Sequence, residues 1–258
     1  MSHPKFVWHE LVTTDLAGAK AFYGKIVEWG SEEPFPGGTT PYTVLTVDGK
    51  GVGGMMTMPG EVQGAPSFWL GYVSCANVDE ASKQVVALGG KIHREPADIP
   101  TVGRFAVVAD PKGAAFVLFT PRDGSSGPTF PRHHPGVFGW AELNTTDWES
   151  AWKFYSTMFG WKETSRMDMG EGFGSYFLFT DAGGGDEAMG GMSNAAKVMG
   201  SPPHWLFYVN VRDLDKAVAA VKQHGGKVLN GPMDVPGNGR VAQCMDPQGG
   251  MFAVYYQG

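Results

Sequence analysis

Residues 7–23 read VWHELVTTDLAGAKAFY, and residues 139–155 read GWAELNTTDWESAWKFY. Both stretches contain the frame W-x-E-L-x-T-T-D, followed by an alanine and then by Phe-Tyr. The similarity continues further along the chain, where FWLGYVSCANVDEASKQVVALGGK parallels HWLFYVNVRDLDKAVAAVKQHGGK. The chain is therefore a tandem repeat of one domain of about 120 residues. We predict domains at residues 1–120 and 137–258, joined by a tether at 121–136 that is rich in Pro, Gly and Ser.

Each copy contains two rounds of the same pattern of elements. Residues 7–13 have the character of a strand, and Thr14 and Asp15 follow as a helix-capping pair. Helical spacing of apolar residues then runs from Leu16 to Ile26. The pattern restarts with a strand at 68–75 and a helix at 79–88, which ends at a glycine pair. Further strands are predicted at 42–47, 53–58, 91–94, 104–109 and 114–120. We interpret each copy as two β-α-β-β-β units, although only two strands are located after the helix of the first unit.

The bulk composition restricts the partners. The net charge is -6, which argues against nucleic acid, whose phosphates require a basic surface. The apolar runs are far too short for a membrane span, and the N-terminal residues do not have the pattern of a signal peptide. With only two cysteines, a disulfide framework is not expected. We therefore expect a cytoplasmic monomer or homodimer whose partner is a small organic molecule.

Three motifs together resemble a known family. They are W-x-E-L-x-T-x-D-x-x-x-A-x-x-F-Y, a V-x-D-h-D-x-A segment (h, apolar) that is complete only in the second copy, and a closing D-P-x-G. This set is similar to the vicinal oxygen chelate superfamily, which includes glyoxalase I, extradiol dioxygenases and bleomycin-resistance proteins. The opening W-x-E-L and the segment P-x-D-[IV]-P-x-x-G-R resemble a two-domain, glyoxalase-like or hydroxylase-like branch. The resemblance implies an α+β fold, in which the two units of each copy form a curved mixed sheet around a cup with helices outside.

The resemblance also implies where a metal would bind. In that family two histidines and a glutamate bind the metal, each at a fixed spacing from a motif residue. The same spacings place the three ligand positions at Trp8, Leu70 and Val117 in the first copy. In the second copy the same positions are Trp140, Leu206 and Ala253. None of these side chains is a strong metal ligand. We therefore predict no cofactor, and a metal-dependent dioxygenase or glyoxalase remains as a disfavoured alternative.

Two histidines, His9 and His204, are the possible replacement ligands. His9 would require a shift of one residue along its strand, which would turn the side chain to the opposite face. Its counterpart in the second copy is Ala141, and a packed histidine is the favoured interpretation. His204 lies two residues before Leu206, on the same face of the predicted strand, and could face the mouth of the second cup.

Glu10 and Glu142 lie two residues after Trp8 and Trp140, which occupy the first ligand position of each copy. Side chains two residues apart on a strand share a face, so both glutamates should point into a cup. A buried carboxylate requires hydrogen bonds or a change of its pKa. Each glutamate could be a structural anchor, held by nearby backbone or by Arg104 or Arg240, or a general acid or base that faces a substrate. The two arginines could clamp an anion or pair with Asp98 and Asp234 at the surface.

The remaining residues around the cups are mostly apolar, which suits a small, largely apolar organic molecule. Such a protein could sequester its ligand or act in detoxification or secondary metabolism. The alternative is a lyase, isomerase or hydroxylase-like enzyme that uses Glu10 or Glu142 as acid or base. The candidate ligand-binding residues are Trp8, Tyr42, Met55, Trp69, Arg104 and Val117 in the first copy, and Trp140, Asn144, Tyr176, His204, Arg240 and Ala253 in the second.

Overall fold

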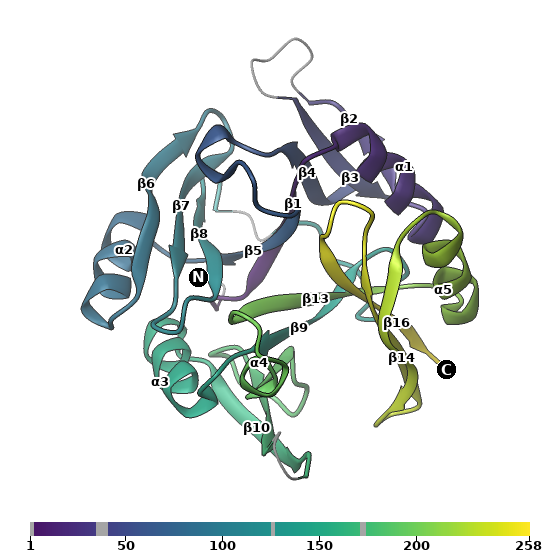
Figure 1. The fold of residues 1–258 in the computed structure, drawn as a ribbon. Helices are drawn as coiled ribbons and strands as arrows, with labels where there is room; N and C mark the ends of the chain where they lie inside the picture. The colour runs from purple at the N-terminus through teal and green to yellow at the C-terminus, as the bar shows by residue number, and fades with distance from the viewer. Residues whose placement is uncertain (1–2, 35–40, 125–126, 171–173) are drawn as a thin grey trace. The chain divides into compact units, whose positions relative to one another are not determined.

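The structure is a computed structural model that describes residues 3–34, 41–124, 127–170 and 174–258. Two β-α-β-β-β repeats make up the first copy, which Figure 1 shows in purple to teal. The first repeat comprises β1 (Phe6–Thr13), α1 (Leu16–Ile26), β2 (Gly30–Glu32), β3 (Tyr42–Val47) and β4 (Lys50–Thr57). A short 3-10 helix (Gly60–Val62) precedes the second repeat, which comprises β5 (Phe68–Ser74), α2 (Val78–Ala87), β6 (Lys91–Ile99), β7 (Gly103–Ala109) and β8 (Ala115–Pro121).

The second copy repeats this order, with one added short helix. Its first repeat comprises β9 (Phe138–Asn144), α3 (Trp148–Phe159), β10 (Lys162–Asp168), β11 (Ser175–Thr180), β12 (Gly190–Ser193) and α4 (Ala195–Met199). Its second repeat comprises β13 (His204–Asn210), α5 (Leu214–Gln223), β14 (Lys227–Val235), β15 (Gly239–Met245) and β16 (Met251–Gln257). The predicted α+β fold of paired β-α-β-β-β units is confirmed.

Each copy contributes one eight-stranded mixed sheet. The strand orders are β2-β3-β4-β1-β5-β8-β7-β6 and β10-β11-β12-β9-β13-β16-β15-β14, so the two copies use the same topology. Within a repeat the first strand runs parallel to the last, as in β1 with β4, and the others pair antiparallel. None of the described helices has the length and apolar content needed to cross a bilayer.

The capping residues of the four long helices come from equivalent places in the repeats. Asp15 accepts a hydrogen bond from the backbone N–H of Gly18 at 2.9 Å, and Asp147 accepts one from Ser150 at 3.1 Å. Asn77 and Asp213 cap α2 and α5 in the same way. These bonds satisfy donors that the first helical turn leaves without partners, which explains why Thr-Asp follows the first strand of each copy.

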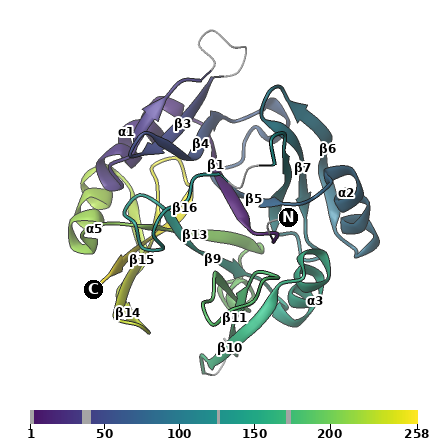
Figure 2. The ribbon, with the colours of Figure 1, turned by 180° about the vertical axis from the view of Figure 1, so that it is seen from behind.

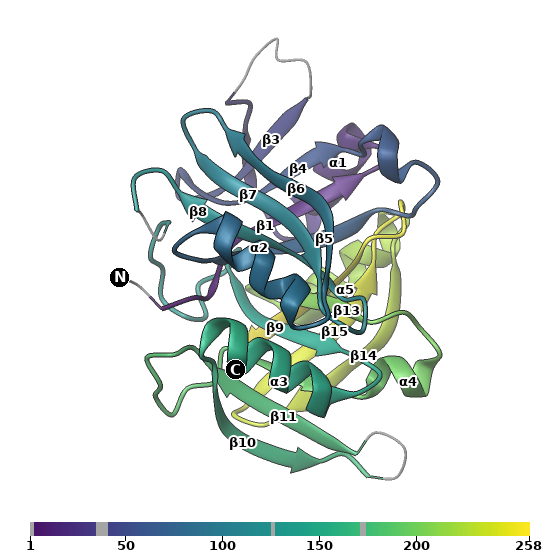
Figure 3. The same cartoon turned by 90° about the vertical axis from the view of Figure 1, so that its left-hand side faces the viewer.

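The chain forms two compact units, and each of them combines one repeat from each copy. Unit one consists of Met1–Val7, Gly71–Gly127 and Trp140–Trp205, and unit two of Trp8–Leu70, Pro128–Gly139 and Leu206–Gly258. In unit one, α2 packs on β6, β7 and β8 (Figure 3). In unit two, α5 packs on β14, β15 and β16 (Figure 2) and also contacts α1.

The Phe-Tyr pair of the repeated frame forms the core of each unit. In unit two, the rings of Phe22 and Tyr23 on α1 lie 6.0 and 5.0 Å from that of Phe252 on β16. In unit one, Tyr155 on α3 lies 5.6 Å from Phe116 on β8. The aromatic pair of one copy therefore packs against the last strand of the other copy. Burying large rings of this kind is a main source of folding free energy.

Candidate functional site

Side chains alternate between the two faces of β1. Trp8, Glu10 and Val12 share one face, whereas His9 and Leu11 share the other. Glu10 lies opposite Gly54 on β4, and Leu11 lies opposite Met55. Glu10 therefore shares its face with Trp8, and Leu11 and Met55 share the opposite face, where both are fully buried.

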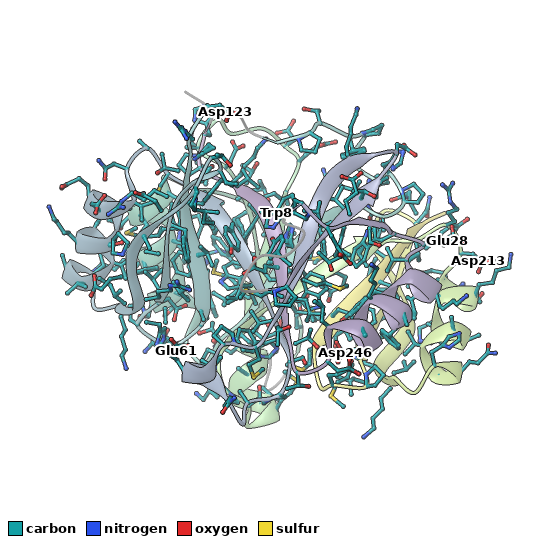
Figure 4. All side chains as sticks on the ribbon, turned by 90° about the horizontal axis from the view of Figure 1, so that it is seen from above. Trp8, Glu28, Glu61, Asp123, Asp213 and Asp246 are labelled. Atoms are coloured by element: carbon teal, nitrogen blue, oxygen red, sulfur yellow. The ribbon has the colours of Figure 1, made fainter. Side chains whose placement is uncertain are left out.

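A chain of hydrogen bonds links three side chains on this face. Trp8, which Figure 4 labels, donates from its indole Nε1 to the hydroxyl of Tyr42 at 3.1 Å. Tyr42 is in turn hydrogen-bonded to Glu10. Burial raises the pKa of Tyr42 well above its usual value, and the charge of Glu10 raises it further. Tyr42 therefore remains a protonated donor to Glu10, which is itself only 7% exposed.

A glycine makes room for this arrangement. The ring of Tyr42 lies across Gly54, where a Cβ atom would collide with the tyrosine hydroxyl. Because glycine has no side chain, the aromatic ring can lie directly on the strand and reach Glu10 from the next strand but one. Glycine at this position is thus required by a close approach of side chain to backbone.

The second copy repeats the arrangement. Trp140 donates to the hydroxyl of Tyr176 at 3.1 Å, and Tyr176 donates to Oε2 of Glu142 at 2.9 Å. A Cβ atom at Gly191 would collide with the ring of Tyr176. Glu142 is half-buried, so it is more open than Glu10. We name the two arrangements the first site (Trp8, Glu10, Tyr42 and Gly54) and the second site (Trp140, Glu142, Tyr176 and Gly191).

Sequence reasoning named the tryptophans, tyrosines and glutamates but did not connect them. It looked for backbone groups or arginines as partners of the glutamates, whereas the structure provides a tyrosine hydroxyl. The two site glycines were missed as well. The repeated Gly-Gly-Met at 53–55 and 190–192 was the available signal, because glycine in a strand often marks a close approach.

Arg104 and Arg240 are held elsewhere by carboxylates. Arg104 makes two hydrogen bonds of 2.8 Å to Asp79 and one of 2.9 Å to Asp98. Arg240 pairs with Asp215 at 3.1 Å and lies 3.8 Å from Asp234. The hydrogen bonds to Arg104 lower the pKa of the Asp79 carboxyl. Both arginines therefore pair with carboxylates at the surface, which was one of the two expected roles; the other was to clamp an anion.

Met55 and Trp69 lie away from the first site. Met55 is fully buried on the opposite face of β4, in register with Leu11. Trp69 donates from Nε1 to the hydroxyl of Tyr23 at 3.0 Å within the core of unit two. Both side chains fill the layer between sheet and helix, because that face of the strand is covered.

The remaining candidates are Val117, Ala253, His204 and Asn144, of which the first three lie on strands that carry no residue of either site. Val117 and Ala253 are fully buried and lie opposite Tyr72 and Tyr208 on the neighbouring parallel strands. His204 is partly exposed at the start of β13, and its Nδ1 lies 2.9 Å from the carbonyl oxygen of Pro202. Asn144 shares the face of Glu142 and is buried.

His9 is packed between aromatic rings. Its imidazole stacks on Phe138 at 4.0 Å between centroids, and it meets Phe207 edge to face at 4.8 Å. Burial lowers the pKa of His9 to about 3, because the charged form would lose its hydration. This environment is that of a neutral, packed histidine.

The donor set does not fit the divalent metal that the fold family implies. The positions that would supply ligands hold tryptophan, leucine, valine and alanine. Among the described residues, the structure brings together no group of three or more His, Cys, Asp or Glu side chains that could hold a metal ion. A catalytic metal site needs several convergent nitrogen, oxygen or sulfur donors, and these residues do not provide them.

Comparisons with known proteins agree with this fold. Residues 5–118 and 137–254 each match the model of the Glyoxalase/Bleomycin resistance protein/Dioxygenase superfamily. The chain is 34% identical to "Putative glyoxylase CFP32" of Mycobacterium bovis, over 96% of this chain and 92% of the relative. It is 30% identical to "Anthracycline biosynthesis protein DauV" of Streptomyces sp. (strain C5), over 96% and 91%.

Solved structures resemble the chain over its whole length. The Mn(II)-bound glyoxalase from Novosphingobium aromaticivorans matches with a TM-score of 0.66 at 16% identity, covering 100% of this chain and 83% of that one. The 2,2',3-trihydroxybiphenyl 1,2-dioxygenase from Sphingomonas wittichii strain RW1 matches with a TM-score of 0.64 at 15% identity, covering 100% and 91%. The chain belongs to the glyoxalase, bleomycin-resistance and dioxygenase superfamily, and both copies of its repeat are members.

Proposed function

We propose that the protein binds a small, flat, largely apolar organic molecule at the first and second sites, and that the glutamate of each site accepts a hydrogen bond from it. The observation that carries the proposal is the recurrence of Trp, Tyr and Glu over a glycine in both copies. One glycine and three specific side chains are thus present at equivalent places in both copies.

The chemistry of the first site supports a ligand that is mostly apolar. Val44 and Met56 lie on the face of Glu10 and are partly exposed, as is the indole of Trp8. An apolar surface with a few well-placed polar groups is the usual composition of a small-molecule site. A hydrogen bond to a buried carboxylate contributes about 1.5–3 kcal/mol, enough to orient a ligand.

The relatives are compatible with this class of ligand. One of them is named for anthracycline biosynthesis, and anthracyclines contain a flat, hydroxylated aromatic ring system. Stacking on an indole and donating a hydroxyl hydrogen to a carboxylate would suit such a molecule. We extend this class, and not a particular compound, to the present chain.

An enzyme is the second candidate. Glu10 is buried and already shares a hydrogen bond with Tyr42, and buried carboxylates of this kind can act as general acids or bases. Replacing Glu10 or Glu142 with glutamine separates the two functions once a natural ligand is known. A binding protein would retain most of its affinity, whereas an enzyme would lose turnover.

A titration with 2-naphthol tests the proposal. The protein is dialysed against a chelator, and binding is then followed with and without added Mn(II). We expect saturable binding that does not depend on the metal, because the carboxylate and the aromatic side chains make the contacts. Binding that requires Mn(II) would favour a metal-dependent function instead.

A further inference from the structure

Beside the two sites, one pair of neighbouring positions changes from apolar to polar side chains. On the face of Glu10, Val12 lies in register with Met56. At the equivalent place beside Glu142, Asn144 lies in register with Ser193. In both copies the first member of the pair follows the glutamate by two residues, so its side chain shares the glutamate's face. An apolar pair in the first copy is thus replaced by an amide and a hydroxyl in the second.

The amide of Asn144 has unused hydrogen-bonding capacity. Asn144 is only 3% exposed and its side chain bonds to no other described residue, but its amide atoms are not fully enclosed, so water can still reach them. The hydroxyl of Ser193, also buried, accepts a hydrogen bond from the backbone N–H of Ala195 at 3.3 Å. Buried polar side chains nearly always have a partner, which can be a bound molecule. A polar group of a bound molecule can therefore reach the Asn144 amide in place of water.

The spacing along the strand defines where that group would be. Two residues on the same face of a strand are roughly 7 Å apart, since the rise is about 3.3 Å per residue. A flat molecule that reaches Glu142 with one polar group can reach Asn144 with a second one at its other end. At the first site the corresponding end of the molecule would meet Val12, which offers no hydrogen bond.

We propose that the two sites select different molecules: the second site binds a flat molecule with polar groups at both ends, held by Glu142 and Asn144, and the first site binds one with a polar group at a single end. This inference rests on the proposed function and adds the specificity of each site. Asn144 and Ser193 are the specificity-determining residues, and Val12 and Met56 are their apolar counterparts.

Each site contains its own reporter. The indole N–H groups of Trp8 and Trp140 donate to the site tyrosines, so their NMR signals should respond to a ligand in the same site. The two signals are assigned in the full-length protein with the variants Trp8→Phe and Trp140→Phe. Titrations then compare 2-naphthol, which has one hydroxyl, with 2,6-dihydroxynaphthalene, which has hydroxyls at opposite ends.

We expect the Trp140 signal to report at least threefold tighter binding of 2,6-dihydroxynaphthalene than of 2-naphthol. The Trp8 signal should report no such preference, or the reverse one. The double variant Asn144→Val with Ser193→Met should abolish the preference at Trp140 and leave the response of Trp8 unchanged. The wild-type comparison requires no substitution, so it remains decisive even where a variant fails to fold.

Two other results would overturn the inference in distinguishable ways. If both signals respond with the same preference for the two probes, the proposed function stands and the difference in specificity is wrong. If neither probe shifts either signal, the proposed function fails, and the assignment of specificity fails with it.

Discussion

Tyr155 on α3 donates a hydrogen bond to Oδ2 of Asp110 at 3.2 Å, although the two residues belong to different copies of the repeat. The reciprocal pair, Tyr23 and Asp246, is joined by a bond of 3.0 Å (Asp246 is labelled in Figure 4). The other carboxylate oxygen of each aspartate accepts backbone N–H groups of its own turn. The tyrosine of the opening frame and the aspartate of D-P-x-G are thus partners within each compact unit.

The first prediction concerns these buried pairs. Tyr155→Phe leaves the buried carboxylate of Asp110 without one partner and the indole N–H of Trp205 without its acceptor at 3.0 Å. We expect the free energy of unfolding to fall by about 1–3 kcal/mol, the usual cost of unsatisfied buried polar groups. Chemical denaturation measures it. Tyr256→Phe, at a partly exposed position, is the control and should change stability by less than about 0.5 kcal/mol.

The second prediction concerns pH. Burial raises the pKa of Asp110 above its value in the unfolded chain, so the folded state binds its proton more tightly. The contribution of Asp110 to the free energy of unfolding is therefore fully present below about pH 3.9. It is lost as the pH rises through the pKa that Asp110 has in the folded state. The stability of wild type relative to Asp110→Asn should fall over this range in denaturation curves measured from about pH 3 upward. A difference that rises with pH would contradict the structure.

The third prediction uses His9, whose pKa is lowered to about 3 by burial. The unfolded chain takes up a proton below about pH 6.5, but the folded chain does not until about pH 3, so stability is lost as pH falls between these values. The slope should be steeper in wild type than in His9→Phe by about 1.4 kcal/mol per pH unit. His224→Gln, at an exposed position, serves as the control. Parallel slopes in wild type and His9→Phe would show that His9 does not remain neutral.

The fourth prediction concerns the site glycines. Gly54→Ala should displace the ring of Tyr42 and break the chain of hydrogen bonds to Glu10, so that the first site loses its ligand while the second retains it. Overpacking of this kind typically costs about 1–3 kcal/mol of stability. The matched control is Gly24→Ala in α1, where an added Cβ meets nothing within 4 Å. It should leave binding intact and stabilise the helix by about 0.5–1 kcal/mol.

The fifth prediction distinguishes the two roles considered for the arginines. Arg104→Gln and Arg240→Gln should leave the affinity of both sites for 2-naphthol unchanged, because both guanidinium groups are engaged with carboxylates of their own units. Titration of each variant is sufficient. A loss of affinity of tenfold or more at either site would assign that arginine to the ligand after all.

The sequence allowed much of the fold to be predicted because the signals were local. The caps Asp15 and Asn77 and the alternation along β1 depend on residues close together in the chain. Strand β2 was missed because its residues, Gly30–Glu32, are all exposed and show no alternation.

The candidate site depends on contacts that no local pattern encodes. The strand face on which Glu10 lies could be predicted by counting residues along one strand, but its partner Tyr42 lies on another strand. From the sequence, Met55 is the candidate of this strand, because the glycines before it give no apolar side chain to set the register. The parallel pairing of β4 with β1 sets it and places Met56 on the face of Glu10.

The most direct test of the account is the reciprocal removal of the two carboxylates. Titrations with 2-naphthol are followed through the indole signals of Trp8 and Trp140 in Glu10→Met and in Glu142→Met. We predict that each variant loses at least tenfold in affinity at its own site only, because a hydrogen bond to a charged group is worth about 1.5–3 kcal/mol. Wild-type affinity at both sites in both variants would contradict the central claim that these glutamates hold the ligand.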